Sequence, residues 1–434
     1  MAGAAAGHQY SAGCWYSVVL LYGIAYYICN LSQEQRGDSL YLTSFIHRNR
    51  LFNIAERWFI GRPEPGDVRA LTEILICDVF IVRDTLETLS SRLMEMLSDG
   101  TLHQENIRFK GELRDILCRD NRDATPRVRE LFSRYMEKPA YYYRETPINA
   151  SVFLDGQGHL LGSYRIKRPK RIAEKANRRI ADWIFGNVLD RAHEMARERA
   201  QLSGIPLEQF VTPQEEMEKE FVRAEEFIAG SFRDGSIRFD RNAMMIQDVG
   251  AVKIVADDET LQRIEKNLRE AGDISVLEQE QFSGNFRATN MILEIPWDPE
   301  HVCQRYRESR AWERYANRGI PQEELQHGLE PFLEGAEQRI SIEVILTTFP
   351  DLVESELGSS IHEERIMTQR DNRNYKGYIP MNVEFLVEFL FAVGFSPRNT
   401  IEDVPIKIWG RYLPETLGSY IRQLYSLPNH DFFG

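Results

Sequence analysis

The sequence predicts an α+β protein with a helical N-terminal region, a compact domain of strands and helices, and a helical C-terminal extension. From about residue 38 to 138, apolar residues recur every three or four positions, as in amphipathic helices. After residue 145, short apolar or alternating runs separated by turn residues indicate strands. A chain of 434 residues, 43% hydrophobic and 27% charged, is long enough for two or three globular domains. We place the domains at 1–145, 146–366 and 367–434.

The stretch from Gln9 to Gln33 is apolar and uncharged, but tyrosine, glycine, serine and asparagine dilute its aliphatic content. It lacks the basic start and the cleavage pattern of a secretory signal. We expect a buried helix and no membrane contact, with a membrane anchor as the alternative. The five cysteines form no CxxC pairs, so they suggest neither a zinc site nor a disulfide framework. A reducing, cytoplasmic location is the expectation that follows.

The central domain is predicted as an alternation of strands and helices. Strands are expected at 148–155, 160–167, 251–256, 274–282, 286–295 and 339–349. Helices are expected from Pro169, from the N-cap Asp258 to Gly272, and after residue 349, with helical insertions at about 176–235 and 298–335. Neither GxxxxGK[ST] nor GxGxxG occurs, which argues against a P-loop or Rossmann unit. The segment 382–395 is predicted as a packing helix of the C-terminal extension.

A dense basic cluster spans residues 164–179 of a chain whose net charge is −13. The overall acidity argues against a general coat protein for DNA or RNA, so we expect a local anion site and no DNA partner. Arg165 and Lys167 are two apart in an extended run and share one face, while Arg171 and Lys175 share a helix face at i and i+4. Mixed arginine and lysine suit a polyphosphate. Four further cations are interpreted as a solvated face or an auxiliary RNA contact: Arg168, Lys170, Arg178 and Arg179.

Two carboxylates complete a candidate site. Asp248 directly precedes the strand at 251–256, and Glu343 lies within the strand at 339–349. Carboxylates on neighbouring strands could hold Mg²⁺, which takes few protein carboxylates and completes its shell with water and substrate phosphates. The alternative is that each acid only caps or edges its own strand.

These segments resemble the synthetase domain of the RelA/SpoT family, the (p)ppGpp synthetases. YRIKRPKRIAEK resembles the family's R-x-K run followed by a helical lysine, and IQDVGAVKIV resembles its D-hydrophobic-x-G-hydrophobic-R strand. FSGNFRATNMILEI is similar to the N-G-Y-x-S-hydrophobic-H segment. ISIEVILTTFPDLVESELGSSIHE is similar to the E-hydrophobic-Q-hydrophobic-R-T strand with the helix beyond it. The four segments occur in family order across about 150–366.

The resemblance implies a mixed-sheet, nucleotidyltransferase-like fold and a pyrophosphokinase of the kind that serves the stringent response. An acceptor hydroxyl would attack the β-phosphorus of ATP, the donor, and AMP would leave. Asp248 and Glu343 would be the catalytic residues and the Mg²⁺ ligands. The implied ATP-binding residues are Arg165, Lys167, Arg171 and Lys175, and the implied acceptor-binding residues are Phe286, Arg287 and Asn290. His362 would have a mainly structural role.

The acceptor side departs from the family pattern. Phe286 stands where the family has tyrosine, Asn290 replaces a histidine, and Ile345 and Thr347 replace glutamine and arginine. The N-terminal region shows no His-Asp signature of the family's hydrolase domain, so ppGpp hydrolysis is not predicted. Two alternatives stay open beside a nucleotide acceptor. One is an inactive nucleotide-binding, regulatory relative, and the other is a toxin-like enzyme that modifies a tRNA or other RNA end. The oligomeric state is not predicted.

Overall fold

The computed structural model describes residues 42–426, apart from residues 99, 121, 123, 207–212, 238–244, 359–362, 366 and 368–377. All described residues belong to one compact unit, Leu40–Gly434. The apolar stretch Gln9–Gln33 and His362 lie outside the described residues. The division of the chain into three domains stays a prediction.

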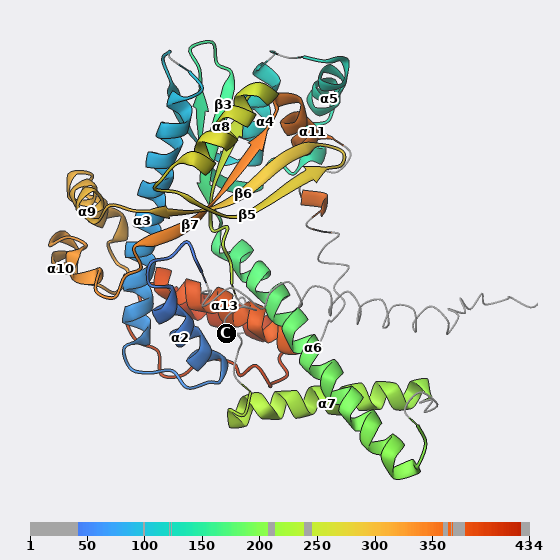
Figure 1. Ribbon diagram of the computed structural model, residues 1–434. Helices are drawn as coiled ribbons and strands as arrows, with labels where there is room; N and C mark the ends of the chain where they lie inside the picture. Colours follow the sequence, from blue (N-terminus) through green and yellow to red (C-terminus); the bar gives the residue numbers. More distant parts are fainter. Residues whose placement is uncertain are drawn as a thin grey trace, which may run out of the picture. The chain divides into compact units, whose positions relative to one another are not determined.

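This unit contains a seven-stranded mixed sheet with the spatial order β1-β2-β3-β4-β7-β6-β5 (Figure 1). Neighbouring strands pair antiparallel, except that β4 and β7 run parallel. The strands are β1 His103–Phe109, β2 Pro147–Leu154, β3 Leu160–Ile166, β4 Gly250–Val255, β5 Ser275–Ser283, β6 Arg287–Pro296 and β7 Arg339–Thr347. The chain is therefore a mixed α/β protein, and each strand predicted after residue 145 is present.

One strand contradicts the prediction of an all-helical N-terminal region. β1 pairs with β2 from His103 opposite Leu154 to Phe109 opposite Pro147, with an irregularity after Ile107. Ile107 is the single buried side chain of this strand. A strand with so little apolar alternation leaves no periodic signal in the sequence, and its order comes from the pairing with β2.

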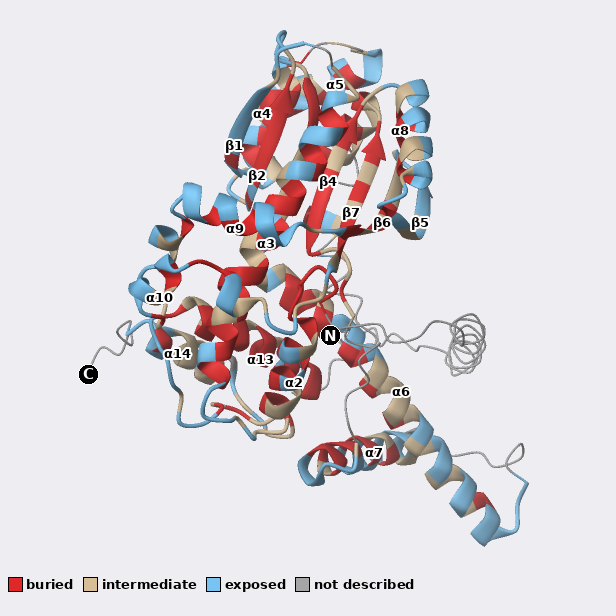
Figure 2. Cartoon of the chain, turned by 60° about the vertical axis from the view of Figure 1, so that its left-hand side comes forward, coloured by how far each residue is buried: buried red, intermediate tan, exposed pale blue. Residues whose placement is uncertain are grey.

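The long helix α3, Asp67–Glu95, covers one face of the sheet and packs against β3 and β4. Two glycines allow this close approach. A Cβ atom on Gly250 would lie 3.1 Å from side-chain atoms of Leu86 and Val82, and a Cβ on Gly162 would lie 2.8 Å from the Met94 methyl group. Figure 2 shows the buried residues along β4 and β7. The opposite face of these strands carries the polar side chains described below.

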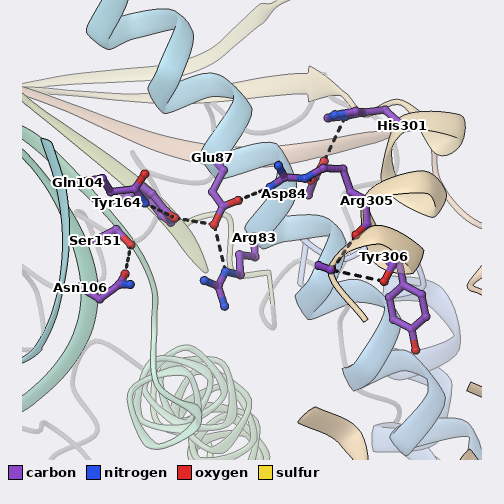
Figure 3. A network of polar contacts seen from close by, with 11 residues as sticks. Arg83, Asp84, Glu87, Gln104, Asn106, Ser151, Tyr164, His301, Arg305 and Tyr306 are labelled. Carbon is purple, nitrogen blue, oxygen red and sulfur yellow. Dashed lines mark hydrogen bonds and ion pairs between the residues drawn. The ribbon is translucent and has the colours of Figure 1, made fainter. Parts of the chain in front are cut away.

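A polar network joins α3 to the sheet and to α9, Pro299–Glu308 (Figure 3). The Tyr164 hydroxyl donates to Glu87 at 2.7 Å, and Arg305 donates to Glu87 at 2.7 Å and to Asp84 at 3.2 Å. Burial raises the pKa of Asp84, although His301 and Arg305 oppose that rise. The network therefore holds the middle of α3 against both neighbours.

Further helices pack at the β1–β2 end of the sheet, and others lie in the chain segment that connects β6 to β7. Around the second apolar cluster are α4 Lys110–Arg119, α5 Pro126–Glu137, η1 Pro139–Tyr142 and α11 Phe349–Leu357. The insertion between β6 and β7 holds α9, η4 Ala311–Tyr315, α10 Gln322–Gln326 and η5 Glu330–Phe332, as the helical texture of 298–335 predicts. Helix α8, Asp258–Glu270, begins one residue earlier than predicted, because Asp257 is its N-cap and accepts from the Thr260 amide at 2.8 Å.

The remaining helices are α2 Arg48–Phe59, α6 Pro169–Ser203, α7 Gln214–Asp234, α13 Tyr378–Phe395 and α14 Pro414–Leu424. Helix α13 packs against α6 and α3, as expected for the predicted packing helix. Among the described residues, α13 is the one helix that is both long enough and apolar enough to cross a membrane; its mean hydropathy is 1.4. Because 67% of this segment is buried inside the protein, it is accounted for as a core helix.

Candidate nucleotide site

The two predicted carboxylates meet at one lysine. β4 and β7 are parallel neighbours with Ala251 opposite Glu343, so Asp248, just before β4, lies close to Glu343 on β7. The Lys167 ammonium nitrogen lies 2.6 Å from Asp248 Oδ2 and 3.2 Å from Glu343 Oε2. Both carboxylates are therefore within reach of one cation.

A second lysine approaches the same carboxylate from a different element. Lys175, on α6, forms an ion pair with Asp248 Oδ2. Burial opposes the charge on Asp248, but Lys167 and Lys175 outweigh burial and hold the pKa of this carboxyl below its ordinary value. Burial lowers the pKa of Lys175, and the neighbouring Lys167 ammonium lowers it further against the pull of Asp248. The pair of lysines therefore keeps Asp248 ionised.

These groups line a cavity of about 280 Å³ between α6 and the sheet. Its cationic wall comes from α6 and its acidic wall from β5 and the carboxylate pair. The charged residues that line it are Lys175, Arg178, Arg179, Asp248, Glu278, Glu280 and Glu343. Asn290, on β6, also lines the cavity and donates from its amide to Glu343 Oε1 at 3.3 Å.

The face of the sheet next to this cavity carries two more cations. Arg165 on β3 lies opposite Ala251, which lies opposite Glu343, so the arginine shares the carboxylate's face at a distance of two strands. Lys253, two residues beyond Ala251, points to the same face. Burial lowers the pKa of Lys253 to about 8. Lys253 was not singled out by sequence analysis, although its place in the buried run AVKIVA was a usable signal.

The helix α6 presents a different set of cations than the sequence predicted. Arg171 pairs with Glu174 at 2.8 Å and Lys170 pairs with Glu388 of α13 at 2.8 Å. Arg178 and Arg179 are exposed, in keeping with their interpretation as a solvated face, and they also line the cavity one turn beyond Lys175. They follow Lys175 at i+3 and i+4 and therefore share its face. The structure brings Lys167, Lys175, Asp248 and Glu343 together and places Arg171 beside Glu174.

The three predicted acceptor residues do not lie together. Phe286 precedes β6 by one residue, whereas the β6 residue opposite Glu343 is Ile292. Six residues along a strand span roughly 20 Å, so Phe286 is remote from the carboxylates. Arg365 lies over the Phe286 ring, 4.9 Å from its centroid.

The neighbouring arginine is engaged at the same remote end of β6. Arg287 forms a 3.4 Å ion pair with Asp351, whose carboxylate also accepts from the Arg287 backbone amide at 2.8 Å. Of the acceptor set, Asn290 alone among the described residues lines the cavity with the two carboxylates.

Comparison with known proteins gives a weak structural likeness. No protein-family model matches the sequence, and no curated protein matches it. A similar solved structure is the crystal structure of the small alarmone synthetase 1 from Bacillus subtilis. It is 12% identical, and the match covers 65% of this chain and 90% of that one with a TM-score of 0.20. Because this superposition is poor, function is inferred below from the chain's own residues.

Proposed function

We propose that this protein is a Mg²⁺- and ATP-dependent pyrophosphokinase that transfers pyrophosphate to a nucleotide hydroxyl, in the manner of a (p)ppGpp synthetase. The observation that carries the proposal is the meeting of Asp248 and Glu343 at Lys167, beside the cationic face of α6. Two carboxylates and a set of phosphate-binding cations are what pyrophosphoryl transfer needs, because the reaction depends on charge neutralisation and alignment.

The donor set fits magnesium. Both carboxylates approach one point, and hard oxygen donors are those that Mg²⁺ takes, with water and phosphate in its remaining positions. Asp248 and Glu343 would hold the ion, which when bound neutralises phosphate charge and favours ionisation of the attacking hydroxyl. Lys167, Lys175 and Arg165 would neutralise the donor phosphates. Asn290 cannot accept the hydroxyl proton, because a carboxamide is not basic; its amide nitrogen donates to Glu343.

The direct test is incubation of the purified chain with γ-labelled ATP, Mg²⁺ and a panel of GDP, GTP, ADP, AMP and tRNA. We expect the label to move to one nucleotide, with one AMP released per label transferred. Label recovered in tRNA would instead support the RNA-end alternative. Absence of AMP with every acceptor, from a folded protein that binds ATP, would contradict the proposal.

We expect replacement of Arg178 and Arg179 by glutamine to weaken ATP binding by about 10-fold, because charge-assisted phosphate contacts are lost. Isothermal titration with MgATP measures the change. The matched control is Arg171→Gln, which we expect to change affinity less than 2-fold, since Glu174 already pairs with Arg171. If Arg171→Gln weakened ATP binding more than the replacement of Arg178 and Arg179, the ATP-binding role would belong to Arg171, as the sequence predicts.

A second candidate function is a nucleotide-binding regulator without turnover. The observation that favours it is the engagement of Phe286 by Arg365 and of Arg287 by Asp351, which leaves the predicted acceptor residues occupied by the protein's own side chains. ATP would then raise the melting temperature, and no AMP would appear with any acceptor in the same panel.

A further inference from the structure

A buried group of three potential metal ligands lies apart from the nucleotide site. His47 immediately precedes α2, and Cys77 and Asp78 are consecutive residues in the middle of α3. One ligand atom from each lies within 4.8 Å of the others. The three residues are 5%, 0% and 0% exposed, and the proposed pyrophosphoryl transfer uses none of them.

The imidazole of His47 is oriented as in many metal-binding histidines. Its Nδ1 lies 2.6 Å from Asp78 Oδ1, and the His47 backbone amide donates to Asp78 Oδ2 at 2.9 Å. A carboxylate that holds one ring nitrogen fixes the ring and leaves the other nitrogen for a metal. Asp78 acts in this way; because it lies on the Nδ1 side of the ring, it is not a ligand of an ion held at Nε2.

The other ring nitrogen, His47 Nε2, is buried and has no hydrogen-bond partner within the described part of the chain. With the proton on Nδ1, Nε2 is an unused acceptor; with the proton on Nε2, it is an unused donor. Either tautomer leaves a desolvated polar atom unsatisfied, which is uncommon in folded proteins. A bound cation would satisfy this atom.

We propose that His47, through Nε2, and Cys77 bind one divalent transition-metal ion while Asp78 orients the imidazole, with zinc the best match to the ligands. Imidazole, thiolate and carboxylate are the groups that bind Zn²⁺ in proteins, whereas Mg²⁺ prefers oxygen alone. Binding forms the metal–sulfur bond and releases the thiol proton to solvent.

The position of His47 indicates what the metal would do. The preceding segment is hydrogen-bonded to both carboxylate-bearing stretches: the Thr43 amide donates to the Ile246 carbonyl at 3.1 Å, and the Ser341 amide donates to the Thr43 carbonyl at 3.0 Å. Ile246 and Ser341 each stand two residues before a carboxylate, Asp248 and Glu343 respectively. A metal bound by His47 and Cys77 would fix the segment before α2, which contains Thr43, against α3.

The test measures metal directly and does not use ATP. The full-length chain, purified from zinc-supplemented cells, is expected to contain about one zinc per chain by elemental analysis. After exchange to Co²⁺, we expect a near-ultraviolet thiolate-to-cobalt charge-transfer band and the strong visible bands of four-coordinate cobalt. Cys77→Ser should abolish the charge-transfer band, and Cys118→Ser, at a half-buried cysteine of α4, should leave it unchanged.

His159 provides a matched control for His47. His159 also contacts a carboxylate, Asp155, at 2.9 Å but is not part of the cysteine-containing group. His47→Gln should remove stoichiometric metal, and His159→Gln should keep it. The proposal is overturned if the wild-type chain takes up no stoichiometric zinc or cobalt, or if the cobalt-loaded chain lacks a thiolate band. A thiolate band that survives Cys77→Ser also overturns it. Because wild-type protein decides the first two outcomes, a misfolded variant does not prevent the test.

Discussion

Asp248→Asn and Glu343→Gln should each reduce AMP release from ATP on the order of 10³-fold. Each removes a negative charge that binds the metal ion, and its loss costs several kcal/mol of transition-state stabilisation. Both substitutions keep the size of the side chain, so a loss of turnover would reflect charge. The measurement is the initial rate of AMP formation with Mg²⁺ and the acceptor identified in the panel.

The control for these variants is Glu259→Gln, an exposed glutamate in the first turn of α8. It should retain the wild-type rate. Turnover close to wild type in both the Asp248 and the Glu343 variant would remove the site from consideration. A loss confined to one of them would mean that the metal depends on that carboxylate alone.

Glu356→Ala should lower the free energy of unfolding by about 3–5 kcal/mol, because it removes the nearest carboxylate of Lys110 and leaves Arg114 with Glu363 alone. Both carboxylate oxygens of Glu356 accept from the Lys110 ammonium at 2.7 Å, and Oε2 also accepts from the Arg114 guanidinium at 3.4 Å. The side chains of Lys110, Arg114 and Glu356 are 5%, 0% and 3% exposed. Urea unfolding at pH 7 measures the loss.

The control is Glu130→Ala, at a carboxylate that pairs with Arg134 on the surface of α5. The exposed side chains of that pair predict a change of at most about 0.5 kcal/mol. If Glu356→Ala were no more destabilising than Glu130→Ala, the buried cluster would not contribute to stability as its geometry indicates.

The stability contributed by Glu356 should also depend on pH. Burial alone would raise the pKa of Glu356, but Lys110, Lys253 and Arg114 outweigh burial and lower it below its ordinary value. The unfolded chain therefore binds this proton more tightly than the folded chain. The contribution is complete above the unfolded pKa of about 4.3 and is lost as pH falls toward the folded pKa. The gap between wild type and Glu356→Ala should narrow below about pH 4.

The sheet and the acids were predictable because their signals are local. Strands β2 to β7 are runs of alternating or apolar residues between turns, and Asp248 and Glu343 stand in or beside such runs. The edge strand β1 was not predictable, since its order comes from pairing with β2 and Ile107 alone is buried. The His47–Cys77–Asp78 group was equally invisible, because 30 positions separate the histidine from the cysteine.

The sequence by itself determined the order of the elements and the residue types of the site: the R-x-K run, its helical lysine and two carboxylates on separate strands. Only the tertiary structure decided which cations face the cavity. The packing of Ile172, Ala176 and Ile180 into the core sets the rotation of α6 about its axis. That rotation places Lys175, Arg178 and Arg179 along the cavity, with Lys175 in contact with Asp248. Helical spacing specifies which residues share a face, but burial against distant residues specifies where that face points.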